Sequence, residues 1–547
     1  MRKVLIANRG EIARRIARTC REMGIGTVAV FSEPDRTAPF VGEADEAVAI
    51  GGAAPSESYL RIDKLIDAAR RTGADAIHPG YGFLAENAEL SQRCLDAGLV
   101  FIGPPPAVIS AMGSKLEAKR RMTGAGVPML PSGEIPAGNP ATNAATKTAD
   151  LDRLAKEIGL PLLVKASAGG GGKGMRIVRE AGELADAVAS ARREAESAFG
   201  DGTVYLERYL EGARHVEVQI FGDTHGNVVH LGERECSIQR RHQKIVEESP
   251  CVVLDPTRRE AMCDAAVLGG RAIGYVGAGT VEFLFAADGR FYFLEVNTRL
   301  QVEHPVTELV TGLDLVRLQI EVARGARLPR QEDLPRARGH AIEVRLYAED
   351  AERDYLPQTG TLRRFEIEPL PGLRVDTGVE TGSVVGVHYD PMLAKVIAWA
   401  SSREESAAKL ARGLESARIH GVRTNRRLLC SILRHAEFLA GRTDTGFLER
   451  YPASELGRDG YDDDLRREHA LVAALALQRN ARAEARVLGF APSGWRNVPS
   501  QDQMRSFESG VGRHDVSYCV VRGELHASVD GVAMGMLRLH ACGDGVV

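Results

Sequence analysis

The chain has 547 residues, 44% hydrophobic and 26% charged, with a net charge of -4 and eight cysteines that lack CxxC or CxxH spacing. This length predicts about three or four domains, while the balanced charge and the lack of a roughly 20-residue apolar run exclude nucleic acid and a membrane as expected partners. The scattered cysteines exclude a zinc site and a disulfide framework, so we expect a cytoplasmic protein, or one of the mitochondrial matrix in a eukaryote.

The first region begins with a βαβ pattern. An apolar strand over 4–7 leads through Gly10 into an amphipathic helix over 11–23 and a second strand over 27–31. The single glycine is not a dinucleotide fingerprint. We therefore expect a Rossmann-like domain at 1–113 that holds no cofactor of its own.

A glycine run in the second region is a candidate phosphate loop. An apolar strand ends at Lys165, and the run that follows consists of Gly169, Gly170, Gly171 and Gly172. Backbone N–H groups free of side chains can wrap phosphates, while a lysine neutralises their charge. The run lacks the ending of a P-loop, and a flexible linker is the alternative. The strand over 175–178 on its far side favours the phosphate loop, which we expect to close over ATP.

Two glutamates flank a predicted hairpin further along. Apolar residues alternate on both sides of the Asp-Gly pair at 288–289, which predicts a type I′ turn. Counting outward from a two-residue turn places Glu282 opposite Glu295, with the carboxylates about 5 Å apart. Opposed like charges ask for a cation, and this pair with the amide oxygen of Asn297 suits Mg²⁺. A solvated sheet face is the alternative.

The segment 233–248 concentrates charge between the glycine run and the hairpin. It follows a strand over 228–231, and its basic residues are Arg240, Arg241, His242 and Lys244. Most such clusters are solvated faces, which remains the alternative interpretation. Together with the hairpin carboxylates, these cations would instead form an anion cradle opposite a metal. Phosphoryl transfer requires both a cationic cradle and a metal ion.

Several ordered motifs carry a resemblance to a known family. They are ANRGEIA from Ala7, HPGYGFLAEN from His78, KASAGGGGKGMR from Lys165, RHVEVQ from Arg214, CSIQRRHQK from Cys236 and EVNTRLQVEHPVTE from Glu295. Residues 1–446 thereby resemble the biotin carboxylase component of biotin-dependent carboxylases. The resemblance implies a multidomain α/β protein of mixed α+β character, with an ATP-grasp domain at 114–333 and a β-rich C-terminal domain at 334–446.

The resemblance also implies a nucleotide site and a metal site. The residues implied to hold ATP are Lys115, Lys165, Gly169, Gly170, Gly171, Gly172, Glu207, Leu210, His215, Gln239, Gln301 and Val302. Among them, Lys115, Lys165 and the glycines would hold the phosphates. Glu207, Leu210 and His215 would line the adenine pocket. The ligands of Mg²⁺ or Mn²⁺ would be Glu282, Glu295 and Asn297, which agrees with the hairpin.

The implied reaction is an ATP-dependent ligation that forms a C–N bond. ATP activates bicarbonate as carboxyphosphate, which releases CO₂ beside the ureido nitrogen of biotin. The residues implied to be catalytic are Glu303, Arg299, Lys244, Arg345 and His242. Glu303 would take the proton of bicarbonate while Arg299 and Lys244 hold the anion in line. Arg345 would stabilise the biotin enolate, since a planar guanidinium suits a ureido oxygen.

The composition changes after Arg450. Residues 465–547 look like the start of the helix-plus-β-barrel domain that docks a carboxylase α subunit onto its carboxyltransferase β subunit. A short string around Trp495 is similar to the 3-methylcrotonyl-CoA carboxylase branch, and a core tryptophan is the alternative. We expect a hetero-oligomer with that β subunit.

Biotin needs a lysine for attachment, and no lysine follows Lys409. We therefore expect biotin to arrive on a carrier domain supplied by an extension of the chain or by another subunit. The expected acceptor is 3-methylcrotonyl-CoA or a related acyl-CoA. The alternatives are a subunit of an acetyl-CoA, propionyl-CoA or urea carboxylase, another ATP-grasp ligase of the carbamoyl-phosphate or purine type, and a non-catalytic docking subunit.

Overall fold

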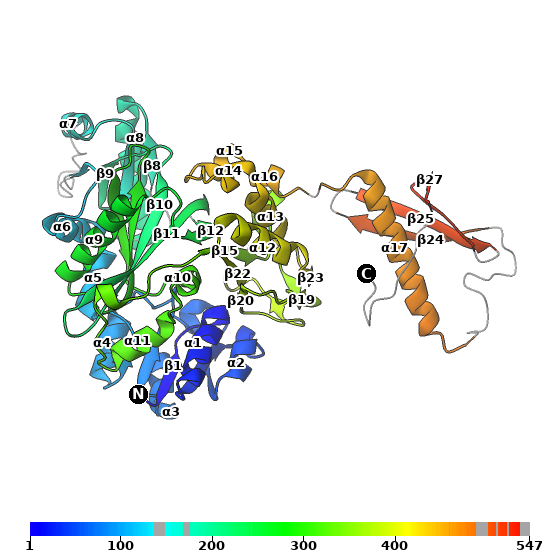
Figure 1. Cartoon of the computed structure of the whole chain (residues 1–547), viewed down its shortest axis with the longest axis horizontal. Helices are drawn as coiled ribbons and strands as arrows, with labels where there is room; N and C mark the ends of the chain where they lie inside the picture. Colours follow the sequence, from blue (N-terminus) through cyan, green and yellow to red (C-terminus); the bar gives the residue numbers. More distant parts are fainter. Residues whose placement is uncertain are drawn as a thin grey trace. The chain divides into compact units, whose positions relative to one another are not determined.

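The computed structural model describes residues 1–135, 148–167, 175–241, 243–458, 460–487, 501–509, 512–521 and 524–535. The chain forms two compact units, Met1–Arg458 and Asp459–Val547 (Figure 1). The described candidate site residues all belong to the first unit. The finer domain boundaries at 113, 333 and 446 stay predictions.

A parallel sheet opens the first unit, with strand order β3-β2-β1-β4-β5. Its strands are β1 (Lys3–Ile6), β2 (Gly26–Ser32), β3 (Glu46–Gly51), β4 (Ala76–His78) and β5 (Val100–Phe101), and its helices are α1 (Gly10–Glu22), α2 (Pro39–Glu43), α3 (Ile62–Thr72), α4 (Ala88–Asp96) and α5 (Pro106–Gly113). This doubly wound order confirms the predicted Rossmann-like arrangement. Beyond the carboxyl end of β1, Asn8 Nδ2 donates to the carbonyl oxygens of Pro79 and Tyr81 at 2.8 and 2.7 Å. The loops after β1 and β4 are thus tied together.

A small antiparallel sheet, with order β6-β9-β7-β8, follows in the chain. Its elements are β6 (Ser132–Glu134), β7 (Leu162–Ala166), β8 (Arg176–Val178) and β9 (Val204–Arg208), with α7 (Thr148–Ile158) and α8 (Leu184–Phe199) packed on it. Lys165 lies on β7 and Glu207 on the neighbouring β9. The strand predicted to end at the glycine run is therefore present, whereas Gly169, Gly170, Gly171 and Gly172 lie outside the described residues.

An eight-stranded sheet with order β14-β13-β10-β11-β12-β15-β22-β20 forms the centre of the first unit. Its strands are β10 (Arg214–Gly222), β11 (Val228–Arg240), β12 (Gln243–Ser249), β13 (Gly277–Phe285), β14 (Phe291–Asn297), β15 (His340–Tyr347), β20 (Leu373–Thr377) and β22 (Met392–Ala400). The charged segment 233–248 is therefore mostly strand and not a polar end to one. Strands before and after residue 333 belong to this one sheet, so the predicted domain boundary at 333 does not divide it.

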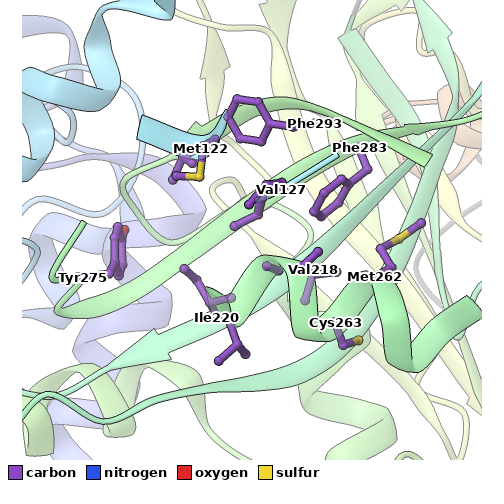
Figure 2. Close-up of a cluster of buried hydrophobic side chains, with 14 of the residues drawn as sticks. Met122, Val127, Val218, Ile220, Met262, Cys263, Tyr275, Phe283 and Phe293 are labelled. Atoms are coloured by element: carbon purple, nitrogen blue, oxygen red, sulfur yellow. The ribbon is translucent and has the colours of Figure 1, made fainter. Parts of the chain in front are cut away.

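The two faces of this sheet differ in chemistry because side chains alternate along each strand. Val218 and Ile220 of β10 point into a hydrophobic core with Phe283 of β13, and Met262 and Cys263 pack there from α9 (Pro256–Ala272) (Figure 2). The intervening residues of β10 point to the other face. Other helices around this part are α6 (Lys115–Gly124), α10 (His304–Thr311) and α11 (Leu315–Ala323).

The remaining elements of the first unit surround the far end of the sheet. Helices α12 (Arg403–Glu415) and α13 (Arg426–Arg434) share a core with β15 and β22. The short elements are β16 (Glu349–Asp350), β17 (Leu356–Pro357), β18 (Gly360–Thr361), β19 (Arg364–Glu366), β21 (Val384–Val385), β23 (Arg418–His420), α14 (Ala436–Leu439), α15 (Phe447–Arg450) and α16 (Ala453–Leu456). This part is β-rich, as predicted.

Within its described residues, the second unit consists of one helix on an antiparallel sheet. Its elements are α17 (Asp463–Ala483), β24 (Gln503–Ser509), β25 (Gly512–Val521), β26 (Glu524–Val529) and β27 (Val532–Ala533). Leu471 and Leu475 of α17 pack against Val516 and Tyr518 of β25. The predicted string around Trp495 lies outside the described residues. No helix in the described part of the chain, α17 included, has the length and apolarity needed to cross a membrane.

Candidate active site

Four adjacent strands place charged side chains in one row across the large sheet. Glu295 of β14 lies opposite Glu282 of β13, and Glu282 lies opposite Glu217 of β10. Glu217 in turn faces Arg234 of β11, whose Nε donates to Glu217 Oε1 at 2.6 Å. Because directly opposed carboxylates repel each other, this row requires further cations close by.

The hairpin between β13 and β14 reaches the predicted pairing by a different route. Gly289 N–H donates to Ala286 O at 3.0 Å, and Ala286 N–H donates to Arg290 O at 2.8 Å, so the loop contains three residues. Gly289 has a φ of 83°, as in three-residue hairpin loops that end in a left-handed residue. A bulge at Leu294 then adds one residue to β14 and restores the opposition of the two glutamates. The prediction of a two-residue type I′ turn was therefore wrong, whereas the predicted pairing of Glu282 with Glu295 is confirmed.

Lys244 of β12 lies where three carboxylates converge. Its Nζ lies 2.6 Å from Glu217 Oε2, 2.8 Å from Glu282 Oε1 and 2.7 Å from Glu303 Oε1. Burial alone lowers the pKa of an ammonium group, but the three carboxylates raise the pKa of Lys244 well above its ordinary value. Ligand atoms of Glu217, Cys236 and Glu303 lie close enough together to hold a metal ion. Lys244 already supplies the positive charge there.

Glu303, the residue before α10, is completely buried between two cations. Besides its contact with Lys244, its Oε2 accepts a hydrogen bond from Arg345 Nη2 at 3.0 Å. Burial raises the pKa of a carboxyl group, but Lys244, Arg345 and Arg234 hold the pKa of Glu303 well below its ordinary value. The side chain is therefore an ionised carboxylate that requires no further partner for its charge.

Arg345 of β15 joins Glu303 to a second buried acid. Its Nε donates to Glu247 Oε1 at 2.6 Å. Burial raises the pKa of Glu247 to about 7, although Arg345 acts in the opposite direction. The guanidinium thus bridges Glu303 and Glu247, and this pairing fixes the plane of its fork.

Glu282 has polar neighbours at both carboxylate oxygens. Its Oε1 accepts hydrogen bonds from Asn297 Nδ2 at 2.9 Å and from Gln301 Nε2 at 3.3 Å, in addition to Lys244. Its Oε2 lies 2.9 Å from His215 Nε2, without the angles of a hydrogen bond. The carboxylate is therefore ionised and oriented toward the polar face of the sheet.

The residues predicted to bind metal fit a hard divalent cation. Burial and the neighbouring charge of Glu282 raise the pKa of Glu295, and Lys115 and Lys165 offset this only in part. A cation between the two carboxylates would relieve that repulsion. Two carboxylates and the amide oxygen of Asn297 are the ligands that Mg²⁺ accepts alongside phosphate oxygens and water.

Arg299 connects the loop after β4 with the metal-ligand candidates. Its Nε donates to Glu86 Oε2 at 2.8 Å, its Nη1 to Gln301 Oε1 at 2.7 Å and its Nη2 to Asn297 Oδ1 at 3.1 Å. Burial lowers the pKa of the guanidinium, while Glu86 and nearby carboxylates raise it, with a net upward shift. Arg299 is thus held in place from two sides.

Two lysines share one glutamate beside the small sheet. Lys165 Nζ donates to Glu207 Oε2 at 3.0 Å, and Lys119 of α6 pairs with Glu207 Oε1. The Lys119 ammonium also lies 4.9 Å from the ring centre of Tyr205. Burial raises the pKa of Glu207, but the two lysines lower it further than burial raises it. Lys115 begins α6 one helical turn before Lys119.

Three cavities follow one another along the polar face and share lining residues. The first, of about 480 Å³, and the second, of about 340 Å³, share Lys165 and His215. The second and a third, of about 640 Å³, share Arg299 and Arg345. The polar face therefore borders a continuous cleft with a large space at each end.

Most of the predicted site residues meet in this cleft. The second cavity is lined by Lys115, Lys165, His215, Gln239, Lys244, Glu282, Glu295, Asn297, Arg299, Gln301, Val302 and Arg345. Glu207 and Leu210 line the first cavity. Glu303 is buried and does not line these cavities, but it contacts Lys244 and Arg345, which do. His242 and the four glycines at 169–172 lie outside the described residues.

Sequence reasoning missed four charged residues that hold these groups: Glu86, Lys119, Glu217 and Glu247. Lys119 follows Lys115 by four residues, a spacing that places both on one helix face. Glu217 alternates with His215 along β10, so period-two counting would have found it. Glu86 contacts Arg299 across 213 positions of sequence, and no local pattern predicts that contact.

Family models match three consecutive stretches of the chain. They are described as "Biotin carboxylase, N-terminal domain" over residues 1–109, "Carbamoyl-phosphate synthase L chain, ATP binding domain" over 114–331, and "Biotin carboxylase C-terminal domain" over 343–450. Together they cover most of the first unit.

Curated relatives and a solved structure agree with these matches. The mitochondrial methylcrotonoyl-CoA carboxylase subunit alpha of Oryza sativa subsp. japonica is 50% identical over 454 residues, which are 82% of this chain and 60% of the relative. The rat protein of the same name is 44% identical over 519 residues, 94% of this chain and 70% of the relative. The chain thus spans about 60 to 70% of these relatives.

The solved structure is the biotin carboxylase domain of 2-oxoglutarate carboxylase from Hydrogenobacter thermophilus, in complex with MgADP, ADP and bicarbonate. It is 44% identical, with a TM-score of 0.79, and the similarity covers 84% of this chain and 99% of that domain.

Proposed function

This chain belongs to the biotin carboxylase family, and on that premise we propose that it carboxylates biotin with ATP and bicarbonate as the α subunit of an acyl-CoA carboxylase. One observation carries the proposal. The buried Glu303 is held between Lys244, which lines the second cavity, and Arg345, which lines both the second cavity and the large third one. A buried carboxylate flanked by two cations can accept a proton from a small anion that the same cations attract.

ATP fits the first two cavities. The adenine would lie beside Glu207, Leu210, His215 and Gln239, which line the 480 Å³ space. The phosphates would then extend into the second cavity toward Lys115 and Lys165, with Gly169, Gly170, Gly171 and Gly172 supplying backbone N–H groups. Glu282, Glu295 and Asn297 would hold Mg²⁺, which supplies charge neutralisation at the β- and γ-phosphates when bound.

Bicarbonate would bind between Arg299 and Lys244, next to Glu303. Glu303 accepts the proton of bicarbonate, and the freed oxygen attacks the γ-phosphorus as the bond to ADP breaks. The resulting carboxyphosphate separates into CO₂ and phosphate in the cleft. Glu303 is a weak base while Lys244 and Arg345 both contact it, because they hold its pKa low. An incoming anion that shares either cation therefore raises the basicity of Glu303 when the proton must move.

Biotin fits the third cavity. Arg345 lines both this cavity and the central one, so its guanidinium can donate to the ureido oxygen of a ring placed beside the newly formed CO₂. The phosphate released from carboxyphosphate accepts the ureido N–H proton, and the donation from Arg345 stabilises the resulting enolate, whose nitrogen attacks CO₂. His242, which lies two residues before Lys244 in the chain, is proposed as an additional catalytic residue.

We infer the acceptor and the partners from the second unit. The alignment with the rat relative covers 94% of this chain and so reaches beyond residue 458. This extent supports 3-methylcrotonyl-CoA or a related acyl-CoA as acceptor, a carboxyltransferase β subunit docked on the second unit, and a separate or additional biotin carrier domain. We place such a hetero-oligomer in the cytoplasm, or in the mitochondrial matrix of a eukaryote.

The test is ADP formation by the purified chain with Mg²⁺ and bicarbonate, with and without free biotin. The proposal expects ADP formation that depends on bicarbonate and rises when biotin is added. ATP binding without any bicarbonate-dependent ADP formation would contradict it. Addition of candidate acyl-CoA thioesters with the β subunit and carrier then identifies the acceptor.

A further inference from the structure

Lys395 is a completely buried lysine that the proposed reaction does not use. It lies on β22, directly opposite Arg345 of β15 and Asp376 of β20. Its Nζ donates to Val302 O at 2.8 Å and lies 3.3 Å from Glu11 Oε1. An ammonium group removed from water is unfavourable unless it is paired and hydrogen-bonded, so these contacts account for its burial.

The contacts of Lys395 have one property in common. Glu11, Tyr81 and Val302 all line the 640 Å³ cavity proposed for biotin. The Lys395 ammonium lies 5.8 Å from the ring centre of Tyr81. The lysine therefore lies behind the wall of that cavity and joins three segments of it: the start of α1, the loop after β4 and the residues before α10.

The bond to Val302 acts directly on the proposed base. The carbonyl group of Val302 and the N–H group of Glu303 belong to the same peptide unit, which is planar. A hydrogen bond that fixes this carbonyl therefore also fixes the position of the Glu303 Cα atom. Small displacements of a reacting group matter, since a shift of about 1 Å can reduce a rate about a hundredfold.

We propose that Lys395 is a positioning residue for the carboxylation reaction, which holds Glu303 between Lys244 and Arg345 through its hydrogen bond to Val302. The contact with Glu11 keeps the ammonium in place and connects the base to the biotin cavity wall. The inference rests on the proposed function. The rival explanation is that Lys395 only balances the buried charge of Glu11.

Two variants separate these explanations. Lys395→Met removes both the bond to Val302 and the partner of Glu11. The double variant Lys395→Met/Glu11→Gln also removes the unpaired acid, so it recovers stability but not the bond to Val302. The matched control is Lys409→Met, because Lys409 donates to the carbonyl of Trp399 outside the cleft. For each protein, kcat for bicarbonate-dependent ADP formation, the KM for ATP and the Tm are measured.

Our inference expects Lys395→Met to lower kcat at least tenfold while the KM for ATP changes less than twofold. In the double variant the Tm should return toward that of the unmodified chain and kcat should stay low. Recovery of kcat in the double variant would overturn the inference, and so would an unchanged kcat in Lys395→Met. Failure of both variants to fold would assign Lys395 to stability alone and also overturn it. A lack of bicarbonate-dependent ADP formation by the unmodified chain would instead contradict the proposed function.

Discussion

Glu282 lies directly opposite Glu295 on neighbouring strands, and the pKa values of the two carboxyl groups are displaced in opposite directions. Burial raises both pKa values. Lys244 and His215 reverse this effect at Glu282 and hold its pKa well below its ordinary value. At Glu295 the charge of Glu282 adds to the effect of burial. The repulsion at Glu295 is therefore not relieved, and a divalent cation bound there would be stabilising.

We expect Glu295→Gln to weaken the use of Mg²⁺ and not the binding of the adenine. The amide keeps the size of the side chain but loses a ligand charge, so the Mg²⁺ concentration that gives half of the maximal rate should rise at least about tenfold. ADP formation is measured against free Mg²⁺ at saturating ATP. The exposed Glu366→Gln serves as control, and an unchanged Mg²⁺ requirement would refute the metal assignment.

The hairpin shows how far the pairing of residues across two strands can be predicted from sequence. Counting from the Asp-Gly pair gave the correct opposition of Glu282 and Glu295, although the loop has three residues and Leu294 forms a bulge. Either irregularity alone would have moved the predicted pairing by one residue. The buried face explains why both occur together, since Phe293 and Val296 must both reach the core while Glu295 points away from it.

Glu303→Gln should keep ATP binding and lose bicarbonate-dependent ADP formation. The amide cannot accept the proton of bicarbonate, and general-base groups contribute about a hundredfold to ten-thousandfold to rates. We expect a loss of at least about a hundredfold in kcat. The increase in Tm on addition of MgATP serves as the control for binding. Normal ADP formation by this variant would eliminate Glu303 as the base.

Arg345→Lys should separate the two half-steps of the reaction. A lysine keeps a positive charge beside Glu303 but cannot present the planar fork that Arg345 holds between Glu303 and Glu247. ADP formation with bicarbonate alone should persist, and its stimulation by free biotin should fall at least about tenfold. The ratio of rates with and without biotin is the measurement. A preserved ratio would show that Arg345 does not act on biotin.

The contacts missed from sequence were long-range ones. The apolar pattern of β15 is local to that strand. Its pairing with β12, which brings Arg345 next to Glu247, depends on how distant segments assemble. The same holds for Glu86, whose motif was recognised without its contact to Arg299. Local periodicity thus predicts the elements, whereas tertiary pairing decides which charges meet.

Glu11 predicts a specific dependence of stability on pH. Burial raises its pKa to about 7, above the ordinary value of 4.5, and Lys395 only partly offsets this. Between these two values the folded chain binds a proton that the unfolded chain has released, so the free energy of unfolding falls as pH rises through this window. The contribution levels off above about pH 7. The full difference corresponds to about 3 kcal/mol.

Glu11→Gln removes this titration. Relative to the unmodified chain, the variant should become progressively more stable as pH rises from 5 to 8. The Tm of the first unit at several pH values is the measurement, and Glu22→Gln, on the exposed part of the same helix, is the control. Burial also raises the pKa of Glu247 and Glu349 to about 7, so the unmodified chain loses stability over the same range for other reasons. Only the difference between variant and control isolates Glu11, and parallel Tm profiles for the two would show that Glu11 is ionised throughout.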